Sequence, residues 1–145
     1  MPGTEGAHAN LRNTRIIASV WSSIRPLAEL YAETARAVLV HARRLGGAEL
    51  VATQGHTLTV GDLLATLAVE AGVHHLDLTT HLPGPPPAPE VLRLVRDTLD
   101  GLIGRPTARD WDDAHYIRVA TGRAPLTEAE RASLGPVAEL FPVFG

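Results

Sequence analysis

The chain has 145 residues, 45% of them hydrophobic and 20% charged, and it contains no cysteine. This length corresponds to about one ordinary domain, and the composition excludes an intrinsically disordered chain. Without cysteine there is no disulfide, no thiolate metal ligand from the chain and no cysteine nucleophile. The formal net charge of −3 argues against a nucleic-acid partner, because nucleic-acid surfaces carry a basic excess.

The start of the chain is polar and lacks the apolar run of a signal peptide. Charges interrupt every apolar stretch well short of the ~20 residues that a membrane helix needs. The sequence therefore predicts a soluble, cytoplasmic protein with no membrane partner. Residues 1–10 lack apolar periodicity and are expected to form a disordered tail. Residues 11–145 are expected to form a single helical domain.

The first regular helix is predicted over residues 22–45, after a less regular helical segment at 11–20. Ser22 or Ser23 is its expected cap, and Gly46 follows its last turn. Apolar residues recur at the spacing of a buried helix face. The stripe consists of Leu27, Leu30, Tyr31, Thr34, Val38, His41 and Leu45.

A β-like fragment at Glu49–Thr53 precedes the most regular helix of the chain. Thr59 and Asp62 form a capping-box-like start, and the proline run beginning at Pro83 ends this helix just before His81. Its expected buried stripe consists of Val60, Leu63, Leu64, Leu67, Glu70, Ala71, His74, Asp77 and Leu78.

Three helices are predicted in the remaining chain. The first spans Pro89–Leu102, and the second spans Trp111–Ala120 behind an Asp110 cap. The third begins at a Thr127–Glu130 capping box and stops at Gly135. The apolar tail, residues 141–144, is expected to pack back on the body. No run with strand periodicity exceeds five residues, so the predicted fold class is all-α.

Glu70 and His74 are the sharpest chemical signal in the sequence. Their i, i+4 spacing places a carboxylate and an imidazole side by side on one face of a helix. That face is the predicted apolar one, where an ionisable group is tolerated when it is paired or bound to a metal. Oxygen and nitrogen donors suit zinc or another divalent ion. The alternative is a structural hydrogen-bonded pair. Asp77 is either an outer partner that orients an imidazole or a solvated residue.

Three stretches of the chain resemble a known family. Residues 51–62 (VATQGHTLTVGD), 70–77 (EAGVHHLD) and 121–131 (TGRAPLTEAER) are similar to the mycothiol-dependent maleylpyruvate isomerase N-terminal family, within the DinB-like four-helix superfamily. The resemblance covers most of the chain from about Trp21 onward. It implies a DinB-like helical bundle with short C-terminal helices.

The resemblance also implies a metal site and thiol chemistry. In this family three residues hold a divalent metal, usually zinc, and the match places Glu70 and His74 among them. The thiol mycothiol is activated at that metal and attacks a small electrophilic substrate. The implied cofactors are therefore zinc and mycothiol, and the implied activity is that of an isomerase or a thiol transferase.

The chain departs from the family at its N-terminal end. The family's first two helices, the second of which carries a further His ligand, have no counterpart, so the bundle is expected to be N-terminally truncated. His41 lies on an apolar stripe and is either the replacement ligand or an ordinary core residue. His56 precedes the most regular helix as a cap or a backbone partner. His75, His81 and His115 are expected at the surface.

Missing helices would leave an apolar face uncovered, so a homodimer is expected. Two function classes remain open. The first is a metal-dependent enzyme that acts on a small thiol and an electrophile. The second is a truncated, non-catalytic relative that serves as a dimeric binding or scaffold module. A third possibility is that the chain is a fragment of a longer enzyme.

Overall fold

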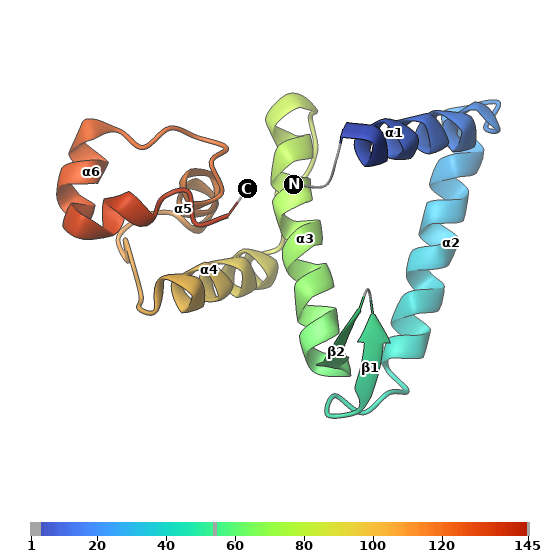
Figure 1. The fold of residues 1–145 in the computed structure, drawn as a ribbon, viewed down its shortest axis with the longest axis horizontal. Coiled ribbons are helices and arrows are strands. Elements are labelled where there is room, and N and C mark those ends of the chain that lie inside the picture. Colours follow the sequence, from blue (N-terminus) through green and yellow to red (C-terminus); the bar gives the residue numbers. More distant parts are fainter. Residues whose placement is uncertain (1–3, 54, 145) are drawn as a thin grey trace. The chain divides into compact units, whose positions relative to one another are not determined.

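The computed structural model describes residues 4–53 and 55–144, and it describes side chains from residue 12 onward. The chain is mostly helical, and the described residues contain six α-helices, one short 3₁₀ helix and one small two-stranded sheet (Figure 1). They form two compact units, divided between Gly46 and Gly47. The helical fold class predicted from the sequence is confirmed. The sequence predicts one domain over residues 11–145, whereas the structure divides into two units between Gly46 and Gly47.

The first unit contains helices α1 (Thr4–Ser19) and α2 (Ile24–Ala42). Helix α1 begins inside the segment expected to be a tail. No residue of α2 is buried, although its sequence predicts a buried stripe through His41, which is exposed. A segment of this length is too short to build a hydrophobic core of its own. The first unit by itself therefore leaves the apolar stripe of α2 uncovered.

The second unit opens with a β-hairpin of strands β1 (Leu50–Thr53) and β2 (His56–Thr59). The strands are antiparallel, with Leu50 opposite Thr59 and Thr53 opposite His56. Gly55, in the turn, has a φ of 84°, a conformation that glycine adopts without strain. The predicted β-like fragment is thus half of a hairpin, which a strictly all-α interpretation misses. His56 is a strand residue rather than a helix cap.

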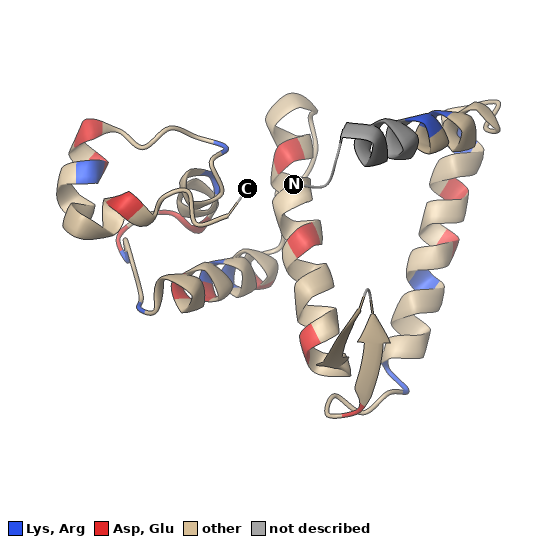
Figure 2. Cartoon of the chain, in the orientation of Figure 1, with Lys and Arg blue, Asp and Glu red and all other residues tan. Residues whose placement is uncertain are grey.

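Helix α3 (Val60–His81) follows the hairpin directly. The Thr59 hydroxyl accepts a hydrogen bond from the backbone N–H of Asp62 at 3.0 Å, which confirms the predicted cap. The helix ends at His81, one residue past the predicted end, and Leu82 is already extended. Its charged residues are all acidic, and they follow one another along the helix in Figure 2.

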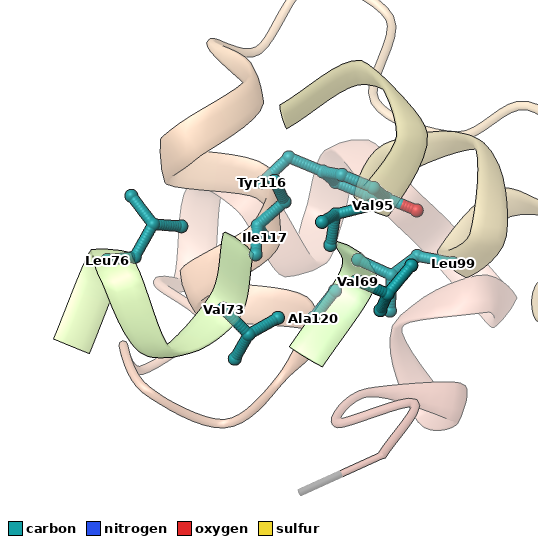
Figure 3. Packing of buried hydrophobic residues seen from close by; sticks show 8 residues of the cluster. All are labelled: Val69, Val73, Leu76, Val95, Leu99, Tyr116, Ile117 and Ala120. Atoms are coloured by element: carbon teal, nitrogen blue, oxygen red, sulfur yellow. The ribbon is translucent and has the colours of Figure 1, made fainter. Parts of the chain in front are cut away.

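The core of the second unit forms where α3 meets α4 (Pro89–Ile103) and α5 (Asp113–Ala120). Figure 3 shows side chains from the three helices converging on one cluster. The cluster consists of Val69, Val73, Leu76, Val95, Leu99, Tyr116, Ile117 and Ala120. On α3 these residues lie on the side opposite Leu67 and Leu78, since successive residues turn by about 100°. The predicted buried face of α3 is therefore wrong from Leu67 to Leu78, although Val60, the first residue of the predicted stripe, is buried.

Helix α3 is apolar on two sides, so the helices that pack against it decide which side is buried. Gly72 faces α4, and a methyl group placed there would lie 2.6 Å from Val91 Cγ1 and 3.1 Å from Val95 Cγ2. This close approach selects the Val69–Leu76 face as the buried one. The competing face keeps Leu67 51% exposed and Leu78 58% exposed.

The C-terminal helices follow local capping signals. Helix α5 begins two residues later than predicted, because Asp112 rather than Asp110 accepts a hydrogen bond from the backbone N–H of His115 at 3.0 Å. Arg96 holds the Trp111 carbonyl outside the helix at 3.2 Å. Helix α6 (Glu128–Leu134) has the predicted capping box, and a 3₁₀ helix, η1 (Gly135–Leu140), follows it. The tail packs against the core as predicted, through Phe141, Val143 and Phe144.

Candidate functional site

The candidate site lies on α3, within the second unit. The Nε2 atom of His74 is 3.6 Å from the Oε2 atom of Glu70. This distance exceeds that of a hydrogen bond. It is close to the roughly 3.3 Å that separates two donors bound tetrahedrally to one zinc ion at about 2.0–2.1 Å each. The close approach predicted from the i, i+4 spacing is confirmed.

Within the second unit, the structure does not show the predicted burial of this pair. The side chain of His74 is 67% exposed and that of Glu70 is 59% exposed. Both lie on the uncovered face of α3, together with the exposed Leu67 and Leu78. The pair is thus at the surface within an apolar surround, because the core is built on the opposite face of the helix.

Asp77 holds the imidazole of His74 from the other side. His74 Nδ1 lies 3.3 Å from Asp77 Oδ2, and in the neutral imidazole an Nδ1–H donor to this carboxylate makes Nε2, which faces Glu70, the acceptor nitrogen. A ligand histidine in a metal site is typically held in this way, by a carboxylate on its second nitrogen. Asp77 therefore has the geometry of an outer partner, one of the two roles that the sequence allowed.

Arg123, from the turn after α5, fixes Asp77 in turn. Its Nε donates to Asp77 Oδ1 at 2.6 Å and its Nη2 to Oδ2 at 3.1 Å. These hydrogen bonds hold the pKa of Asp77 below its ordinary value of 3.8, and the weaker bond from His74 acts in the same direction. The result is a chain of contacts from Glu70 through His74 and Asp77 to Arg123. Asp77 and Arg123 are 46 residues apart in sequence, so sequence spacing gives no signal for this contact.

The donor set suits zinc, but two donors do not complete a site. Among the described residues, no group of three or more His, Cys, Asp or Glu side chains is arranged to hold a metal. His41, the suggested third ligand, belongs to the first unit and lies on the exposed surface of α2. Glu70 and His74 therefore fit part of a tetrahedral zinc shell, whose remaining positions need further ligands.

The other histidines of the second unit have separate roles. His75 is half-buried, and its Nε2 lies 3.0 Å from the carbonyl oxygen of Pro85. His115, expected at the surface, is half-buried and contacts Glu130, with its Nε2 2.6 Å from Oε1. This contact joins α5 to α6. His81 is exposed, as expected.

Comparison of the chain with protein families, with curated proteins and with solved structures finds no match. The resemblance carried by residues 51–62, 70–77 and 121–131 thus remains a prediction. Within the described part of the chain, every helix is too short or too polar to cross a membrane.

Proposed function

We propose that the protein binds a divalent metal, zinc by its donor chemistry, through Glu70 and His74. The observation that supports this most is the pairing of a 3.6 Å carboxylate–imidazole separation with a carboxylate on the second imidazole nitrogen. A histidine held by Asp77 loses little rotational freedom when it takes a metal, and a preorganised ligand binds more tightly.

The surround of the pair supports the same proposal. Leu67 and Leu78 flank it on a helix face that nothing covers in the second unit. Metal sites of helical bundles are built from Glu and His side chains that project between facing helices. A facing helix supplies both the missing ligand and the cover for these leucines. In our proposal His41 is that ligand.

The proposed activity is thiol transfer to, or isomerisation of, a small electrophilic substrate. The chain contains no cysteine, so the reacting thiol is a separate small molecule, and mycothiol is the thiol implied by the family resemblance. A bound zinc ion lowers the pKa of a coordinated thiol and so supplies the thiolate nucleophile. In this proposal Glu70 and His74 hold the metal, and Asp77 fixes the imidazole. The proposed location is the cytoplasm, where small thiols stay reduced.

Metal analysis of dialysed protein tests the proposal. We expect zinc at a fixed stoichiometry in the wild type, and Glu70→Ala or His74→Ala to lower zinc affinity about tenfold or more. His56→Ala is the matched control, because His56 is exposed and lies outside the site. Equal zinc content in all four proteins would exclude the site. His41→Ala tests the third ligand: zinc affinity falls if His41 binds the metal and is unchanged if it does not.

The thiol step has its own test. Cobalt replaces zinc in such sites and reports thiolate coordination by a charge-transfer absorption band. We expect that band when a small thiol is added to cobalt-loaded wild type, and not with His74→Ala. If the spectrum of the cobalt-loaded protein does not change when the thiol is added, thiol activation is ruled out, but metal binding is not.

A second function is favoured by one separate observation, the uncovered apolar stripe of α2. None of the 19 residues of α2 is buried, and Leu27, Tyr31 and Val38 are exposed. Soluble monomers rarely expose continuous apolar patches beyond about 300–600 Å². The corresponding proposal is a homodimeric binding or scaffold module in which a second copy covers this stripe.

Sedimentation equilibrium at micromolar concentration tests the dimer. We expect a dimeric mass for the wild type and a monomeric mass for a Tyr31→Glu/Val38→Glu variant. Those two residues are two helical turns apart on one side of α2. Arg36→Gln, on the other side of the helix, is the control and should remain dimeric. If the dimer dissociates when a chelator is added, the two copies share a metal site and both proposals hold together. A monomeric mass for the wild type would rule out the dimer.

A further inference from the structure

A hollow of about 200 Å³ lies beside the last turns of α3, within the second unit. Asp77, Thr80 and His81 line it from α3, and Arg118 and Arg123 line it from α5 and the turn after it. The volume corresponds to roughly six or seven water molecules. It therefore fits a small molecule or one anionic group of it.

The charges in this hollow do not balance. It contains one carboxylate, Asp77, against two guanidinium groups, and Arg123 occupies that carboxylate with two hydrogen bonds. The third guanidinium nitrogen of Arg123 donates to the carbonyl of Thr121 at 3.3 Å. Arg123 and Asp77 thus satisfy each other and form one wall of the hollow.

Arg118 is the unbalanced charge. Its side chain makes no hydrogen bond and no ion pair with any described residue, although the residue is half-buried. Other partly buried arginines of this unit are paired, Arg96 with Asp113 and Arg123 with Asp77. A partly desolvated guanidinium gains most from an anion that accepts two parallel N–H bonds.

The neighbours of Arg118 leave room for such an anion. The hydroxyl of Thr80 donates to the Leu76 carbonyl at 2.8 Å, so it brings no negative charge to the hollow. His81 is exposed at the rim and adds a further N–H donor. The only carboxylate among the lining residues is already neutralised. The hollow therefore presents a net positive surface.

We propose that this hollow binds the carboxylate or phosphate group of a small molecule, with Arg118 as the residue that anchors it. The site is distinct from the proposed metal ligands, since neither Glu70 nor His74 lines it. Asp77 contributes to both, as the partner of His74 on one side and of Arg123 on the other. A ligand anchored at Arg118 would lie near the uncovered face of α3 that carries His74.

The competing explanation is that Arg118 only complements the C-terminal dipole of α5, in whose last turn it lies. A cation in that position stabilises the helix whether or not a ligand is present. The two explanations predict different results for ligand binding. If Arg118 only complements the helix dipole, the hollow does not need to bind an anion.

Calorimetric titration of the full chain at low ionic strength, with inorganic phosphate and with succinate as probes, tests the proposal. We expect the wild type to bind at least one probe, and Arg118→Gln to bind it about ten- to hundredfold more weakly. The stronger probe identifies the anion class. Arg93→Gln is the control, because Arg93 is an exposed arginine of α4 without a described partner, and its binding should equal that of the wild type.

Backbone amide NMR of the wild type is the second measurement, and it stands even if Arg118→Gln does not fold. We expect probe-induced shifts to cluster at residues 77–81 and 118–123. Binding of neither probe, equal binding by Arg118→Gln, or shifts centred elsewhere would each overturn the proposal. These titrations contain no metal, so their failure leaves the zinc proposal standing and the failure of zinc binding leaves this one standing.

Discussion

The guanidinium group of Arg96 lies over the ring of Tyr116, with its central carbon 4.4 Å from the ring centroid. Tyr116 is fully buried and donates to Asp100 Oδ1 at 2.7 Å. Burial raises the pKa of Tyr116, and the bond to Asp100 raises it further. Arg96 and Asp100 both lie on α4, so this aromatic ring is held between two opposite charges of one helix.

Arg96 also organises the loop between α4 and α5. It donates to the carbonyls of Trp111, Thr107 and Ala108 and pairs with Asp113 at 2.7 Å. Only 11% of its side chain is exposed. A planar fork with five N–H donors can serve these acceptors together, and an ammonium group cannot.

We predict that Arg96→Ala lowers the free energy of unfolding by about 3 kcal/mol, because it leaves buried carbonyls and a carboxylate without their partner. Arg96→Lys should recover only part of this loss. Arg93→Ala, on the exposed side of the same helix, should change stability by less than about 0.5 kcal/mol. Urea unfolding followed by circular dichroism measures all three. A similar loss for Arg93→Ala would refute the special role of Arg96.

Two glycines give a second prediction, with opposite signs. Gly72→Ala should destabilise the protein by about 1–2 kcal/mol, because its methyl group would meet Val91 and Val95 and force α3 and α4 apart. Gly101→Ala in α4 meets no atom within 4 Å and should stabilise the protein by up to about 1 kcal/mol. Thermal melts compare the pair. Stabilisation by both substitutions would mean that α4 does not approach α3 at Gly72.

Local signals in the sequence predicted the starts of α3 and α6 correctly. The caps at Thr59 and Thr127 depend on residues three positions away, so the sequence alone contains both partners. The i, i+4 approach of Glu70 and His74 is equally local. Helix geometry fixes such contacts before any tertiary structure forms.

The buried face of α3 could not be predicted in the same way. Leu67 and Leu78 on one side and Val69 and Val73 on the other give α3 two apolar faces. Packing partners from α4 and α5 decide between them, and periodicity within α3 contains no information about those partners. The same holds for Arg123, whose contact with Asp77 joins distant parts of the chain.

The Asp77 contact leads to a third prediction. Asp77→Ala should lower zinc affinity by about ten- to hundredfold, although Asp77 is not itself a proposed ligand. The reason is that His74 loses the carboxylate that fixes its ring and its protonated nitrogen. Asp77→Asn keeps an oxygen acceptor and should retain part of the affinity. Competition with a chromophoric chelator measures each constant. Wild-type affinity in Asp77→Ala would show that the contact with His74 does not orient a ligand.

The last prediction concerns acid and the capping box of α6. Glu130 Oε2 accepts hydrogen bonds from the hydroxyl of Thr127 at 2.7 Å and from its backbone N–H at 2.8 Å. These bonds, with a further one from His115, lower the pKa of Glu130 from 4.5 to about 2. Since the pKa is lower in the folded state, the carboxylate stabilises the fold above about pH 4.5. This contribution is lost as the pH falls through that range to about 2.

In Glu130→Gln, stability should therefore fall less steeply with acid than in the wild type. Urea unfolding between pH 5 and pH 2, in steps of about half a unit, measures the difference. Glu128→Gln is the control, because Glu128 is an exposed acid of the same turn whose side chain makes no hydrogen bond with the described residues. Carbon NMR of the Glu130 carboxyl gives its titration directly, and a midpoint near 4.5 would contradict the proposed strength of the capping box.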